Sequence, residues 1–309
     1  RDHFRSPSSA QVWFEWRHHG RSLPALVAIL LPFELSLLFV FSDTPVLLFE
    51  TIVAVLLTPP FMAAFVAATV SRSSPEGSSS YELTPFVATR PLTGASLVAA
   101  KLKTTIRSTL ASWLLVLVAV PLALRLSGTS SVVVDGWRQF IEVVGTPRAF
   151  GIGLLALAAL VASTWKQLVQ SLYIGMSGRQ WLVKASVFLA LSLLTIIVVL
   201  AQWIIGNREV IAALWNALPW ILAALVCCKL SAAAWIAMRL HDSRLLSGRT
   251  LVIGAICWDV AVLGLYGLLL WIVPTLLFPG YLLALVAILA IPLARLSAAP
   301  LALAWNRHR

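Results

Sequence analysis

Charged residues are scarce in this 309-residue chain, at 11% against about 25% in an average soluble domain. Hydrophobic residues make up 60%, and the mean hydropathy is +0.92. A soluble fold would need more polar surface to cover this apolar content, and a disordered chain would need low hydrophobicity. The apolar runs are long and do not alternate as barrel strands do. The composition therefore predicts an all-α, polytopic helical membrane protein.

Cysteine is also scarce, and Cys227, Cys228 and Cys257 show no disulfide or metal-ligand spacing. The chain contains no His-Glu-x-x-His motif, paired-carboxylate motif, Gly-x-Ser-x-Gly elbow or P-loop. We therefore expect no enzymatic activity, cofactor or metal, and any ATP hydrolysis would belong to a partner subunit. The five histidines, all in predicted cytoplasmic flanks, are His3, His18, His19, His241 and His308.

Basic residues exceed acidic ones, with a net charge of +11. Such an excess can indicate nucleic-acid binding, but in a membrane chain it is more typical of cytoplasmic loops. We expect no nucleic-acid partner.

Eight apolar runs are long enough to cross a bilayer core, which takes about 20 residues. We predict spans at 23–42, 45–70, 109–126, 150–165 (extending toward 173), 182–205, 210–238, 251–273 and 276–294. The last two spans are separated by a short connection, so an alternative is that they are partly re-entrant. The predicted domains are an interfacial helix at 1–22, a transmembrane domain at 23–305 with a cytoplasmic loop at 71–108, and a tail at 306–309.

The distribution of Lys and Arg predicts the orientation. Seventeen of these residues lie in the N-terminal segment, in the loops after spans two, four and six, and in the tail, whereas four lie in the opposite loops. By the positive-inside rule, both termini are cytoplasmic.

The N-terminal segment predicts a short amphipathic helix in the cytoplasmic interface. Val12, Trp13 and Trp16 share one face at helical spacing, whereas Glu15 and Arg17 face elsewhere. Gly20 would end this helix, and Pro24 would open the first span. The helix could be a simple membrane anchor, or a lever that couples a cytoplasmic partner to the first span.

A second candidate segment lies between spans two and three. Pro85 and Pro91 hold the chain extended, and Thr93 can cap a helix that begins at Gly94. This short cytoplasmic helix would carry Leu97, Val98 and Leu102 on one side and run through Lys101 into span three. A helix entered by a rigid turn suits the transmission of force.

These two segments resemble permeases of the ABC-2 exporter type. Arg90-Pro91-Leu92-Thr93-Gly94-Ala95-Ser96-Leu97-Val98-Ala99-Ala100-Lys101 is similar to that family's coupling helix, and Trp13-Phe14-Glu15-Trp16-Arg17 to its aromatic stretch before span one. The resemblance covers about the first 125 residues. It implies a bacterial inner or plasma membrane location, a cytoplasmic P-loop ATPase partner and a dimer of permease halves. The coupling residues it implies are Trp13, Glu15, Trp16, Arg17, Arg90, Pro91, Gly94 and Lys101.

Two features depart from the family pattern. The family's usual core has six spans, whereas eight are predicted here. The chain also begins at Arg1 without Met, so we expect either that its start is processed or trimmed or, as we favour, that it is the C-terminal half of a longer permease.

Charged residues inside predicted spans are costly and often functional. They are Glu34, Glu50, Lys166, Lys229, Asp259 and Arg295. Lys229 and Asp259 lie at similar depths in consecutive spans, which predicts an ion pair with either a structural or a transport role. Glu34 has no partner at equal depth, so it faces a polar cavity or carries a proton.

These charges leave two other functions open. One is an ion- or proton-coupled secondary transporter that uses Glu34, Lys229 and Asp259, although the sequence shows no inverted repeat. The other is a membrane-embedded enzyme or a non-catalytic subunit of a larger complex. The residues do not identify a transported substrate.

Overall fold

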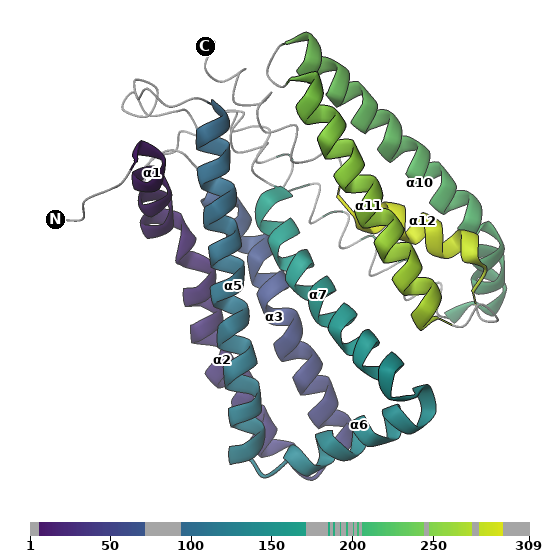
Figure 1. The fold of residues 1–309 in the computed structure, drawn as a ribbon. Helices are drawn as coiled ribbons and strands as arrows, with labels where there is room; N and C mark the ends of the chain where they lie inside the picture. The colour runs from purple at the N-terminus through teal and green to yellow at the C-terminus, as the bar shows by residue number, and fades with distance from the viewer. Residues whose placement is uncertain are drawn as a thin grey trace. The chain divides into compact units, whose positions relative to one another are not determined.

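The computed structural model describes residues 6–71, 94–170, 207–243, 247–273 and 278–292, with seven isolated helical residues between 185 and 206. Every regular element in these ranges is a helix, so the all-α class is confirmed (Figure 1). The chain divides into two compact units, one of residues 1–77 and 83–176 and one of residues 78–82 and 177–309.

The first unit contains seven helical segments in its described part. They are α1 (Pro7–Glu15), the π-helical segment η1 (Trp16–Gly20), α2 (Ser22–Val40), α3 (Pro45–Ser71), α5 (Gly94–Leu126), α6 (Ser130–Val144) and α7 (Thr146–Gln170). The second unit contains α10 (Arg208–Asp242), α11 (Gly248–Ile272) and α12 (Gly280–Ala290).

Six helices of the described part are long and apolar enough to cross a membrane. They are Pro7–Val40, Pro45–Ala67, Ser96–Leu126, Thr146–Val169, Glu209–Asp242 and Gly248–Ile272. They coincide with the predicted spans one to four, six and seven, which supports a multi-pass membrane protein. The predicted fifth span, 182–205, falls outside the described residues apart from isolated positions.

The core of the first unit lies among α2, α3, α5 and α7. Its buried members are Leu23, Val27, Leu31, Val55, Ala63, Val66, Trp113, Val116 and Leu168. Large apolar side chains also cover the outside of this bundle, such as Phe33 at 70% and Phe65 at 62% exposure. Lipid acyl chains can solvate these side chains, so the bundle is apolar on both its inner and its outer faces.

One local prediction is wrong, since Gly20 does not end the N-terminal helix. Instead, α1 continues through η1 and a turn at Arg21 into α2. The predicted continuation of the coupling helix into span three is confirmed, because both belong to one continuous helix, α5, which begins at Gly94. Between α5 and α7 the structure contains α6, which lies outside every predicted span.

In the second unit, the last predicted span is a short helix within the described residues. α12 has 11 residues and is therefore about 17 Å long, well below the roughly 30 Å of a bilayer core. It ends at Ala290, and the next residue, Ile291, has the extended backbone that is favoured before a proline such as Pro292. α12 alone could not cross the bilayer core, whereas α11, at the seventh predicted span, is long enough to do so.

Candidate functional site at the junction of the N-terminal helix and α5

A buried ion pair joins α1 to α5. The Lys101 ammonium lies 3.1 Å from Oε2 of Glu15, and the two side chains are 3% and 8% exposed. The side-chain amide of Gln11, one turn earlier on α1, donates to Oε1 of Glu15 at 3.1 Å. Each carboxylate oxygen of Glu15 therefore has a hydrogen-bond donor, as a buried charge requires.

The local sequence explains why Glu15 is positioned so firmly. A reciprocal capping box between Ser6 and Ser9 starts α1, and Pro7 occupies its first turn. These features fix the helix from its first residue. Gln11 and Glu15 are four residues apart and so lie on one face, and that face packs against the early turns of α5, where Leu97 and Val98 are buried.

The close approach of η1 to α5 depends on Gly20. A Cβ atom at Gly20 would lie 2.6 Å from a ring carbon of Trp16 and 2.7 Å from Cγ2 of Thr104. Neither gap leaves room for a methyl group. Single π turns are uncommon and often occur at functional sites, and this one lies directly beside the buried ion pair.

A stripe of polar side chains continues from Lys101 along α5. Its members, all at most 3% exposed, are Thr104, Thr105, Ser108, Thr109 and Ser112. Two indole groups of the bundle bind hydroxyls at this level: Trp165 donates to Thr105 at 3.1 Å, and Trp113 donates to Thr164 at 3.0 Å. We define the polar stripe of α5 as the residues Lys101, Thr104, Thr105, Ser108, Thr109 and Ser112. The i, i+3, i+4 spacing of these residues in the sequence indicates that they share one face of a helix.

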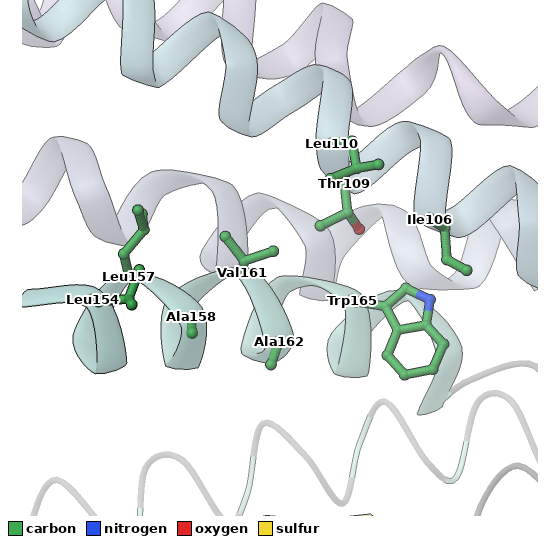
Figure 2. A pocket seen from close by; sticks show the side chains of 9 residues that line it. All are labelled: Ile106, Thr109, Leu110, Leu154, Leu157, Ala158, Val161, Ala162 and Trp165. Carbon is green, nitrogen blue, oxygen red and sulfur yellow. The ribbon is translucent and has the colours of Figure 1, made fainter. Parts of the chain in front are cut away.

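Beside this stripe, α5 and α7 form an open apolar groove of about 440 Å³ (Figure 2). Ile106 and Leu110 line it from α5, and Val161, Ala162 and Trp165 from α7. Thr109 also lines it; its hydroxyl is buried and has no hydrogen-bond partner. A groove of this size and lining suits an apolar ligand better than a charged solute.

The other predicted coupling residues have varied positions. Trp13 is 38% exposed, and the Arg17 guanidinium lies 5.2 Å from its ring centroid. Trp16 is partly buried, within η1. Gly94 is the first residue of α5. Arg90 and Pro91 lie outside the described residues. The expectation that Glu15 lies on another face than Val12 is wrong, because Val12 and Glu15 are both buried, together with Gln11.

Glu34, in α2, is hydrogen-bonded to α3. The Thr58 hydroxyl donates to Oε1 of Glu34 at 2.6 Å and also lies 3.1 Å from the carbonyl oxygen of Ala54. The other carboxyl oxygen, Oε2, is buried without a hydrogen-bond partner. The sequence indicated no partner for Glu34 at equal depth. In the structure its partner is the uncharged hydroxyl of Thr58.

Lys229, in α10, binds the carboxyl end of α12. Its ammonium donates to the carbonyl oxygens of Ile288 at 2.6 Å, Leu289 at 3.2 Å and Ile291. Pro292 has no N–H to donate to the Ile288 carbonyl, so the ammonium occupies a position that the helix itself cannot fill. The cation also complements the negative end of the helix dipole.

The predicted ion pair between Lys229 and Asp259 is wrong, because it is not among the ion pairs of the described residues. Asp259 is exposed on α11. Its neighbour Trp258 instead approaches the end of α12, where its indole N–H donates to the Ile291 carbonyl at 3.3 Å. Lys229 and Trp258 therefore meet at the Ile291 carbonyl, and backbone carbonyls take the place of the predicted carboxylate.

No group of three or more His, Cys, Asp or Glu side chains placed to hold a metal ion occurs in the described ranges. Comparison of the chain with protein-family models, curated proteins and solved structures finds no match.

Proposed function

We propose that this chain is the membrane-spanning permease subunit of an ATP-driven exporter of the ABC-2 type, with ATP hydrolysis in a separate cytoplasmic subunit. The observation that carries the proposal is the buried contact between Glu15 and Lys101. These residues belong to the two segments whose sequences resemble the family's interfacial and coupling helices. They lie 86 residues apart in the chain, yet they form one site.

The site could transmit a movement of either cytoplasmic segment to two membrane spans. α1 continues through η1 into the first span, and the early turns of α5 continue into the third. A push by an ATPase on either segment would therefore reach both spans, because the buried pair resists separation of the two helices. In this proposal the chain itself is non-catalytic and works in the cell membrane, as a dimer of permease halves.

The first experiment is purification of the full-length protein from its native membrane in a gentle detergent, followed by mass spectrometry. We expect a P-loop ATPase in stoichiometric amount. Recovery of the chain alone, with no nucleotide hydrolysis in the eluate, would contradict the proposal.

A second experiment tests the junction itself. In the copurified complex, Glu15→Gln should lower the permease-dependent part of ATP hydrolysis, whereas Arg138→Gln, an exposed charge on α6, should not. Equal hydrolysis by both variants would show that the junction does not couple the two subunits.

Glu34 favours a second candidate function, an ion- or proton-coupled secondary transporter. A carboxyl group inside a membrane span with one unpartnered buried oxygen is a functional candidate by default. Transport that an uncoupler abolishes, that ATP does not affect and that Glu34→Gln eliminates would favour this function over the exporter.

A further inference from the structure

The connections of α6 confine it to one membrane boundary. Both α5 and α7 are long and apolar enough to cross a bilayer. Residues 127–129 separate α5 from α6, and Gly145 alone separates α6 from α7. Three residues span at most about 10 Å, so α6 cannot move far from the ends of these spans. Figure 1 shows α6 running across from the end of α5 to the start of α7.

The residues of α6 divide into two sectors at 100° per residue. The polar sector contains Ser131, Asp135, Arg138, Gln139 and Glu142. The apolar sector is centred on Val133, Trp137, Phe140, Ile141 and Val144, with Val134 at one edge and Val143 at the other. Ser130, the first residue of the helix, falls within the apolar sector, and Val132 lies beside Gln139. A division of this kind is typical of helices that lie in a membrane interface.

The centre of the apolar sector packs on the first unit. The Trp137 ring lies 5.7 Å from the Phe150 ring of α7, and Val133 packs against the cluster of Leu38, Leu48 and Ala123. A Cβ atom at Gly136 would lie 2.7 Å from the Phe49 ring of α3. α6 is therefore held on the ends of α3, α5 and α7 rather than suspended in water.

The described residues of the first unit do not cover the two edges of the apolar sector. Val143 is 85% exposed and Val134 is 47% exposed. On the polar sector, Asp135 and Arg138 form an ion pair at 3.7 Å with side chains 64% and 72% exposed. Water can solvate the polar sector, but the valine edges need an apolar environment.

We propose that α6 is an interfacial helix whose valine edges insert into the boundary between lipid headgroups and acyl chains, and that its partner is zwitterionic phospholipid. The continuity of α6 with two membrane-spanning helices places the lipid interface beside these edges. Trp137 is of the residue type that prefers this depth. Interfacial helices that depend on anionic lipid carry Lys and Arg on their polar face, whereas α6 has Asp135, Arg138 and Glu142 and a net charge of −1.

The experiment uses the full chain in phosphatidylcholine vesicles, with Cys227, Cys228 and Cys257 replaced by alanine. Single-cysteine variants at Val143 (apolar edge) and Gln139 (polar sector) receive an environment-sensitive fluorophore. We expect a nitroxide attached to lipid to quench the label at 143 several-fold more than the label at 139, and aqueous iodide to show the reverse order. Both positions are exposed, so neither substitution disturbs packing.

Three outcomes would overturn the proposal. Equal iodide quenching at 139 and 143 would mean that α6 lies in water. Protection of 143 from both quenchers would mean that protein covers this edge. Lipid quenching at 143 that appears only with added phosphatidylglycerol would contradict the zwitterionic partner. None of these outcomes depends on an ATPase partner, so failure here and failure of the exporter proposal are distinguishable.

Discussion

Removal of one member of the buried ion pair should destabilise the first unit strongly. Glu15→Gln leaves the Lys101 ammonium at 3% exposure without its compensating carboxylate. Breaking a buried pair in this way costs about 3–5 kcal/mol. The double variant Glu15→Gln with Lys101→Met removes both charges, and replacement of a buried pair by neutral groups is often close to neutral. We therefore expect the double variant to recover most of the loss.

The assay is thermal unfolding of the detergent-solubilised protein, with the wild type, both single variants and the double variant measured together. Arg138→Gln is the matched control. Arg138 also pairs with a carboxylate, that of Asp135, but these side chains are 72% and 64% exposed. Exposed ion pairs contribute at most about 1 kcal/mol to stability. The single variants at the junction should unfold several degrees lower than this control.

Additive effects would refute the reasoning. If the double variant loses the sum of the two single losses, Glu15 and Lys101 are not energetically coupled, and their contact does not hold α1 against α5. Single variants as stable as Arg138→Gln would refute the burial of the pair itself.

Three further predictions concern other contacts. Gly20→Ala should cost about 1–3 kcal/mol by overpacking, whereas Gly254→Ala, which has nothing within 4 Å of the new Cβ, should be neutral or stabilising in the same thermal assay. Lys229→Met should speed hydrogen exchange of the backbone in α12, because the helix end loses charge-assisted hydrogen bonds; unchanged exchange would contradict this role. Thr109→Val should not destabilise the protein, since it removes an unpaired buried hydroxyl, whereas Thr164→Val should cost about 1–3 kcal/mol by leaving an indole N–H unpaired.

Hydropathy alone located the spans that the structure describes, because burial in lipid requires long apolar runs whatever their packing partners are. It did not locate α6, because polar and apolar residues are interspersed along the 15 residues of this helix and form no long apolar run. A search for a 3.6-residue period over 130–144 would have found this helix.

The partners of buried charges were harder to predict. Lys101 and Glu15 both belonged to candidate coupling segments, but nothing local in the sequence indicates that residues 86 positions apart meet. For Lys229, the sequence indicates Asp259 as the carboxylate at similar depth, but the ammonium binds backbone carbonyls instead. These carbonyls lie at the end of α12, next to Pro292. Because every residue has a backbone carbonyl, pairing opposite charges in the sequence could not identify them as the partners of Lys229.

The π-helical segment η1 also determines the rotational phase between α1 and α2. Each residue of an α-helix advances the chain by about 100°, so deletion of one residue within Trp16–Gly20 would rotate α1 about its axis relative to the first span. Glu15 would then turn away from Lys101 although every remaining side chain was unchanged. An insertion or deletion before Ser6 would have no such effect. The spacing between Glu15 and the first span is therefore as much a determinant of the junction as the charges themselves.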